Sequence, residues 1–184
     1  PEGHRLRDIL EVRLRHSKIV ETLARFGQPE VTGSYFYDLM TWRDIDLCLA
    51  VRRPTPQLMM KLGNELVKIK GLATMYYRNE FVLDTPGNPK GVFWCLEIMH
   101  NGKLWKIDIL VARKNIVEKV IAPGRSLKKK LTQESRETIL KLKMKLCKLK
   151  EYRRNFRSTE IYDAVISGGV KTLKEWKHWE KSGK

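Results

Sequence analysis

The chain has 184 residues, of which 42% are hydrophobic, enough for one sizeable core with a smaller appendage but too few for two full domains. It contains no apolar run near the roughly 18 residues of a membrane span and no secretory signal pattern, so we expect a soluble, cytoplasmic protein without a membrane partner. Lys and Arg outnumber Asp and Glu by 37 to 21, a formal net charge of +16. This excess favours a polyanionic partner such as nucleic acid, with a basic surface that serves only solubility as the alternative.

The first half of the chain predicts a helix followed by two strands. Apolar residues recur at helical spacing over residues 4–26, and Gly27 with a nearby proline ends the pattern. A short strand over 29–32 and a turn or short helix over 35–42 should follow. The next segment, 44–51 ("DIDLCLAV"), predicts a second strand.

A second helix is marked by its capping residues. Thr55 is a good N-cap and Pro56 suits the first helical position. The helix should end at Gly71 after apolar residues at helical spacing, namely Leu58, Met59, Leu62, Leu66 and Ile69. A strand over 72–84 and a loop over 85–91 complete this region.

The segment 91–112 predicts a β-hairpin. Asn101 and Gly102 stand between two alternating runs, which is the strongest short hairpin signal in a sequence. A two-residue turn there would pair Cys95 with Asp108, so Asp108 lies in the middle of a strand with apolar neighbours. Because Asp is disfavoured inside strands, we expect it to have a function.

The last third of the chain is helical and strongly basic. A helix should begin near Thr132, and another at Ser158 or Thr159 that continues to about 179, where Gly168 and Gly169 would either kink the helix or permit close packing. We therefore divide the chain into a core, 1–125, and a basic helical C-terminal extension, 126–184.

Cys48, Cys95 and Cys147 are odd in number and lack a CxxC spacing. This pattern argues against disulfides and a structural zinc site. We expect buried thiols.

Asp44 and Asp46 are two positions apart in the predicted strand 44–51, so their side chains lie on one face about 6.6 Å apart. An isolated pair of this kind is most often a solvated strand end. A third carboxylate from a neighbouring strand would instead complete an oxygen-rich Mg²⁺ site, and two-metal sites serve phosphoryl transfer. Asp108 is the best candidate for that third ligand.

Gly33 and Ser34 lie at a turn between a strand and a helix, upstream of the two aspartates. Glycine lets the backbone approach a phosphate closely, and serine offers a hydroxyl and an amide. Most Gly-Ser pairs are ordinary turns, so the position of this pair is what makes it a candidate phosphate site.

Together these motifs resemble the signature of the nucleotidyltransferase superfamily that includes DNA polymerase beta. Gly33 and Ser34 are followed after nine residues by Asp44 and Asp46 in an Asp-hydrophobic-Asp-hydrophobic pattern, and Asp108 in "WKIDIL" matches the third acidic residue on a later strand. The resemblance covers roughly residues 5–112. We assign the basic C-terminal third to no subfamily.

This resemblance implies an α/β (α+β) fold, with a mixed sheet flanked by helices and a basic helical extension. It also implies a nucleoside triphosphate substrate and two Mg²⁺ or Mn²⁺ ions. Asp44 and Asp46 would hold the ions, Asp108 would complete the catalytic metal site and help activate an acceptor hydroxyl, and Gly33 with Ser34 would hold the triphosphate. Lys106 would contact the triphosphate or, as an equal alternative, form an ion pair with Glu97.

The acceptor has to be inferred from charge, because the superfamily includes enzymes that modify antibiotics, tRNA ends and proteins, and small toxins. Cationic antibiotics suit a chain of +16 less well than RNA does. Lys141, Lys145 and Lys148, with Tyr152 beyond them, form a stripe that either follows RNA phosphates or is only a solvated face.

The leading hypothesis is therefore a metal-dependent nucleotidyltransferase that transfers a nucleoside monophosphate to an RNA end, with a toxin-like enzyme acting on tRNA among the candidates. The alternatives are a small-molecule or antibiotic nucleotidyltransferase, and a nucleic-acid-binding module whose catalytic centre is vestigial.

Overall fold

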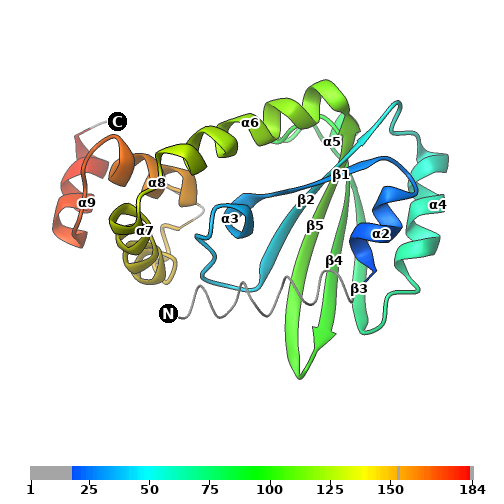
Figure 1. Ribbon diagram of the computed structural model, residues 1–184, viewed down its shortest axis with the longest axis horizontal. Helices are drawn as coiled ribbons and strands as arrows, with labels where there is room; N and C mark the ends of the chain where they lie inside the picture. The colour runs from blue at the N-terminus through cyan, green and yellow to red at the C-terminus, as the bar shows by residue number, and fades with distance from the viewer. Residues whose placement is uncertain (1–17, 153, 183–184) are drawn as a thin grey trace. The chain divides into compact units, whose positions relative to one another are not determined.

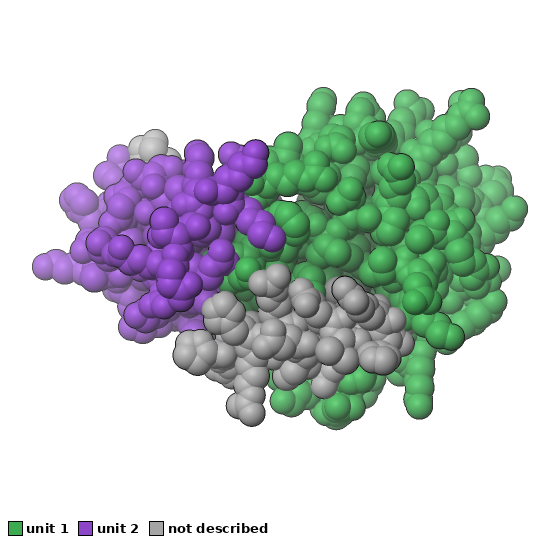
Figure 2. All heavy atoms as spheres, in the orientation of Figure 1, with its two compact units in different colours: residues 1–125 green, residues 126–184 purple. Residues whose placement is uncertain are grey.

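The computed structural model of the protein describes residues 18–152 and 154–182 (Figure 1). Two compact units are present, residues 1–125 and residues 126–184, which Figure 2 colours separately. The first unit contains the sheet and the second consists of helices, so each is described by itself.

The first unit is built on a five-stranded mixed sheet of order β1-β2-β5-β4-β3. β2 and β5 are parallel, whereas the other neighbouring pairs are antiparallel. Helices flank the sheet, so the predicted α+β class with a mixed sheet is confirmed. The strands are β1 (Gln28–Thr32), β2 (Asp44–Val51), β3 (Leu72–Asn79), β4 (Val92–His100) and β5 (Lys103–Arg113).

One face of the sheet carries the main hydrophobic core. Helices α2 (Ile19–Ala24) and α4 (Pro56–Leu66) contribute buried side chains to it, together with Ile45, Leu47 and Ile107 from the two central strands. Burying each such side chain stabilises the fold by about 1.5–3 kcal/mol. Because side chains alternate along a strand, this burial turns the intervening aspartates of β2 and β5 toward the opposite face.

The opposite face is covered by α6 (Lys114–Lys130), whose Val117 and Ile121 pack on Cys48 and Leu110. This helix was not predicted from the sequence, because Pro123 lies inside it and proline normally interrupts a helix. Its buried residues pack on Cys48 and Leu110, which come after Asp46 and Asp108 along the two strands. The aspartates of β2 remain half-buried.

The β-hairpin has the register that was predicted. Asn101 and Gly102 have φ angles of 47° and 66°, the left-handed values that a two-residue turn of this kind requires. Cys95 lies opposite Asp108 and Glu97 lies opposite Lys106.

Two other elements of the first unit end earlier than predicted. The Oγ1 atom of Thr55 accepts a hydrogen bond from the Leu58 amide at 3.2 Å, which confirms the cap, but α4 ends at Leu66 and not near Gly71. The strand β3 ends at Asn79, and the remainder of the predicted strand forms α5 (Glu80–Leu83). The Asn79 side chain caps that helix.

The helix predicted over residues 4–26 is described only in its last part, Ile19–Ala24, and residues 4–17 lie outside the described chain. Lys18 precedes it with a left-handed backbone (φ 58°), so the helix does not continue through this position. A further short helix, α3 (Gly33–Phe36), follows β1 as expected.

The second unit contains α7 (Gln133–Leu146), α8 (Ser158–Ile166) and α9 (Leu173–Lys181). The prediction of one continuous helix from 158 onward is wrong, because the segment forms two helices. Gly169 has a left-handed backbone (φ 64°), and the Thr172 side chain caps the start of α9 by accepting from the Glu175 amide at 3.2 Å. The chain therefore turns between α8 and α9.

Candidate active site

Three carboxylates converge on the face of the sheet opposite α2 and α4. The parallel pairing of β2 with β5 places Asp46 directly opposite Asp108, and Asp44 two residues earlier on β2. Asp44, Asp46 and Asp108 each offer one carboxylate oxygen, and these three atoms lie within 4.8 Å of one another. The structure thus brings together the three predicted metal ligands.

The donor atoms of this cluster fit a hard divalent cation. Mg²⁺ is held in proteins by carboxylate oxygens and water, and here all three ligands are half-buried carboxylates. The Oδ1 atom of Asp108 is buried and accepts no hydrogen bond from the residues that the structure describes. Because an unsatisfied buried carboxylate oxygen is costly, a cation at this position would compensate for it.

Lys106 lies among the carboxylates. Its Nζ atom is 2.5 Å from Asp108 Oδ2 and 3.7 Å from Asp44 Oδ1. Burial alone would lower the pKa of Lys106, but the hydrogen bond to Asp108 and the charges of Asp108 and Asp44 raise it above its ordinary value. The lysine is therefore a fixed positive charge within the site.

The alternative partner of Lys106 was Glu97, which lies opposite it in the hairpin. Glu97 instead accepts a hydrogen bond from Thr74 Oγ1 at 2.8 Å. Lys106 therefore forms its ion pairs with Asp108 and Asp44 and not with Glu97.

Gly33 contacts the site through its backbone. It has φ 69°, and a Cβ atom at this position would lie 2.0 Å from Asp46 Oδ2. Only glycine fits there without displacing the carboxylate. Ser34 follows in the first turn of α3, and its carbonyl accepts from the Leu39 amide at 2.8 Å.

Two side chains near the triad were missed from the sequence. Trp42 donates from Nε1 to Asp44 Oδ2 at 3.3 Å and so orients that carboxylate. Tyr76 is on β3 and lies opposite Cys95 of β4. It is therefore in the same row across the sheet as Asp108 and Asp46. The position of Trp42 just before "RDID" could have indicated that it lies near Asp44. The place of Tyr76 near the triad could not be predicted, because it depends on the pairing of β3 with β4.

The two thiols near the site have raised pKa values. Burial, and then the charge of Asp108, raise the pKa of Cys95 to about 11. Burial, and then the charge of Asp46, raise the pKa of Cys48 to about 12. Both are protonated near neutral pH and free of disulfides, as expected for buried thiols, whereas Cys147 is only partly buried.

The predicted basic stripe lies in the second unit. Lys141 and Lys145 are exposed on α7, and Lys148 is exposed just after that helix ends. Tyr152 is half-buried, with its ring edge-on to Phe156 and its hydroxyl 2.7 Å from Ser158 Oγ. Tyr152 therefore contributes to the packing of this unit.

None of the helices in the described chain is both long and apolar enough to cross a bilayer.

No protein-family model matches the chain, and no curated protein is significantly similar to it. Solved structures are similar in fold. The Cid1 poly(U) polymerase has 14% identity and a TM-score of 0.51, over 76% of this chain and 41% of that chain. The GLD-2/RNP-8 complex has 13% identity and a TM-score of 0.56, over 88% and 57%. The non-canonical poly(A) polymerase complex GLD-2/GLD-3 has 14% identity and a TM-score of 0.59, over 90% and 56%.

The chain thus spans about half the length of these solved structures. At such low identity the similarity concerns the arrangement of helices and strands. The protein has the nucleotidyltransferase fold, and the resemblance predicted from the motifs is confirmed at this level.

Proposed function

We propose that the protein is a metal-dependent nucleotidyltransferase that moves a nucleoside monophosphate from a nucleoside triphosphate to a hydroxyl group at an RNA end. The observation that carries this proposal is the convergence of Asp44, Asp46 and Asp108 within 4.8 Å, on a nucleotidyltransferase fold. Transfer at a phosphoryl centre requires mainly positioning and charge neutralisation, and a cluster of carboxylates at this place is suited to both.

Each residue has a defined part in this proposal. The acceptor oxygen bonds to the α-phosphorus, the bond between the α- and β-phosphates breaks, and pyrophosphate leaves. Asp44 and Asp46 would hold the metal ions, and Asp108 would complete the site and accept the proton of the acceptor hydroxyl. When bound, Mg²⁺ or Mn²⁺ neutralises charge on the attacking and leaving oxygens. Gly33 and Ser34 hold the triphosphate, and Lys106 contributes a positive charge beside it.

The proposed acceptor rests on charge and on the named neighbours. The chain carries a formal charge of +16, which attracts a polyanion and disfavours cationic small molecules. The similar structures include a poly(U) polymerase and a non-canonical poly(A) polymerase, both named for RNA products. Exposed Lys141, Lys145 and Lys148 provide the proposed RNA contacts. A tRNA end is one such acceptor.

The test is transfer of label from each of the four α-³²P-labelled ribonucleoside triphosphates. The full chain is incubated with Mg²⁺ or Mn²⁺ and either total RNA or a small-molecule extract. We expect label in RNA, dependent on the metal. Asp44→Asn, Asp46→Asn and Asp108→Asn should each abolish the transfer without unfolding the protein, and Asp163→Asn, an exposed aspartate of α8, is the matched control.

The outcomes separate the alternatives. Label in the small-molecule fraction would identify a small-molecule nucleotidyltransferase. RNA binding without any transfer, whichever metal is present, would indicate a module with a vestigial centre. Activity retained in two of the three variants would contradict the assignment of the triad.

A further inference from the structure

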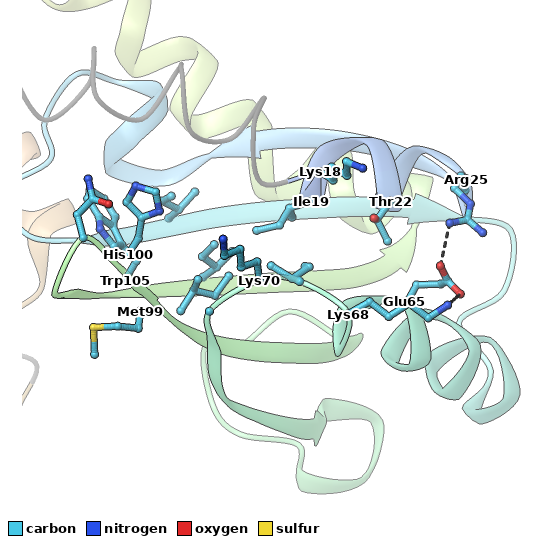
Figure 3. A pocket seen from close by; sticks show the side chains of 16 residues that line it. Lys18, Ile19, Thr22, Arg25, Glu65, Lys68, Lys70, Met99, His100 and Trp105 are labelled. Atoms are coloured by element: carbon cyan, nitrogen blue, oxygen red, sulfur yellow. Dashed lines mark hydrogen bonds and ion pairs between the residues drawn. The ribbon is translucent and has the colours of Figure 1, made fainter.

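A cavity of about 860 Å³ lies on the core-bearing face of the sheet, opposite the face that carries the three carboxylates. Its floor is apolar and consists of Ile45, Ile98, Trp105 and Ile107 from β2, β4 and β5. Figure 3 shows it between α2, the segment after α4 and the end of the β-hairpin. Its volume is in the range of cavities that bind small molecules.

The rim of this cavity is positively charged. Lys18 and Arg25 line it from the α2 side, and Lys68 and Lys70 line it from the segment after α4. Glu65 is the acidic residue among the lining residues, and it pairs with Arg25 at 2.9 Å and Lys68 at 2.6 Å (Figure 3). Among the described side chains, Lys18 and Lys70 have no carboxylate partner, so their charges are uncompensated.

Trp105 lines the same cavity and contributes a hydrogen-bond donor. Its side chain is 4% exposed, and its Nε1 atom has no hydrogen-bond partner among residues 18–152 and 154–182. A buried indole normally donates to an acceptor, because an unpaired donor loses its hydration without compensation. An acceptor atom on a molecule inside the cavity would satisfy it.

We propose that this cavity binds a small amphipathic anion, a molecule with an apolar body and one carboxylate, sulfonate or phosphate group. The apolar body packs on the three isoleucines of the floor, the anionic group faces Lys18 and Lys70, and an acceptor atom takes the hydrogen bond from Trp105. This site is separate from the proposed nucleotidyltransferase centre, because alternate residues of β2 and β5 serve the two faces of the sheet.

The first experiment uses three probes with the full chain. Binding of 8-anilinonaphthalene-1-sulfonate is followed by its fluorescence, and decanoate and decyltrimethylammonium are added as competitors. We expect the aromatic sulfonate to bind at one site and decanoate to displace it. Decyltrimethylammonium, a cation with an alkyl chain of similar length, is the control. We expect it to displace the probe about tenfold less well or worse, because it meets the lysines with a like charge. Equal displacement by the cation would overturn the proposal.

Charge variants locate the binding site. Lys18→Glu combined with Lys70→Glu should weaken binding of the sulfonate about tenfold or more, since each lost charge-assisted contact weakens binding by roughly that factor. Lys61→Glu combined with Lys119→Glu changes the net charge equally at exposed lysines outside the cavity and should leave binding unchanged. An equal loss in both double variants would overturn the proposal.

Two further variants complete the test. Trp105→Phe keeps a ring but removes the donor, and it should weaken binding several-fold in protein that its melting curve shows to be folded. Asp46→Asn should leave binding unchanged, which keeps this result independent of the proposed enzyme activity. If the full chain does not bind the probe, the proposal fails.

Discussion

The charges of four side chains decide how the candidate active site behaves without metal. Carboxylates about 5 Å apart repel each other by a few kcal/mol per pair at an effective dielectric constant near 20. The Lys106 ammonium offsets part of this repulsion because it contacts Asp108 and lies 3.7 Å from Asp44. Removing one of the three carboxylate charges therefore relieves part of the repulsion that a bound cation would otherwise offset.

Asp46→Asn should therefore stabilise the metal-free protein or leave its stability unchanged. In chelator, the variant should melt at or above the temperature of the parent, because one repulsive charge is removed. Millimolar Mn²⁺ should raise the melting temperature of the parent by binding only the folded state, and most of that rise should be lost in the variant. Thermal melts of both proteins, with Asp163→Asn as a control, measure this. A variant that melts well below the parent in chelator would make Asp46 a structural residue.

Gly33→Ala should disturb the site through the backbone. The added Cβ would lie 2.0 Å from Asp46 Oδ2, and alanine is strained at φ 69°. We expect a loss of about 1–3 kcal/mol in the free energy of unfolding, together with a smaller Mn²⁺-induced rise in melting temperature.

Gly102→Ala is the matched control for this variant, since Gly102 also has a positive φ (66°) but nothing lies within 4 Å of its Cβ position. Both variants should be destabilised by strain, and only Gly33→Ala should lose its response to metal. An equal metal response in the two variants would argue against Gly33 as a contact of the site.

At the scale of elements, a buried carboxylate explains why the strand predicted over 72–84 stops early. Glu80 is 1% exposed and accepts hydrogen bonds from the Thr85 amide at 3.0 Å and from Asn88 Nδ2 at 2.9 Å. Its carboxylate is also 2.5 Å from Arg78 Nε. Thr85 and Asn88 come from the following loop and Arg78 from the end of β3, so α5 and the loop are ordered around one side chain.

Glu80 should contribute to stability in a defined pH window. Burial alone would raise the pKa of Glu80, but the hydrogen bonds of Asn88 and Thr85 and the charge of Arg78 lower it from 4.5 to about 2. Because the pKa of Glu80 is lower in the folded protein than in the unfolded chain, its ionised carboxylate stabilises the fold. This contribution to stability is complete above about pH 4.5 and is lost as the pH falls toward 2.

Glu80→Gln should therefore lower the melting temperature at pH 7, and the variant should lose less further stability than the parent between pH 4.5 and pH 2.5. Melting curves across this range measure both effects. Glu118→Gln, at an exposed glutamate of α6, is the control. Parallel pH profiles for the parent and Glu80→Gln would contradict the ordering role of this carboxylate.

At the scale of the whole molecule, the positive charge should make RNA binding depend strongly on salt. Replacing Lys141, Lys145 and Lys148 together by Gln should weaken RNA binding and flatten the slope of log affinity against log salt. Each lost phosphate contact should reduce the slope by about 0.7 on single strands and about 0.9 on duplexes. Nucleotide binding should hardly change.

The control for this triple variant replaces Lys61, Lys103 and Lys119 by Gln. These are exposed lysines of the first unit. It changes the net charge by the same amount. If the slope of the first variant equals that of the parent, or if both variants flatten it equally, the stripe on and after α7 is only a solvated face.

Several parts of the fold were predictable because their signals are local. The turn at Asn101 and Gly102 specified the hairpin register, and Thr55 with Pro56 specified the start of α4. By contrast, α6 was not predicted, because Pro123 is a signal against a helix in the sequence. The helix forms nevertheless, since packing on the sheet stabilises it. The division of the last helix into α8 and α9 depended on the backbone at Gly169, where a kink and a full break look alike in sequence.

The sequence by itself determined which residues could form the site, since the spacing of Asp44 and Asp46 and the position of Asp108 within a strand follow from the alternation of side chains and from turn chemistry. Only the tertiary structure decided that β2 and β5 are parallel neighbours, that Lys106 pairs with the carboxylates and not with Glu97, and that Gly33 contacts Asp46. The physical reason is that turns and side-chain alternation depend on residues close together in the chain. The pairing of distant strands depends on how the whole core is buried.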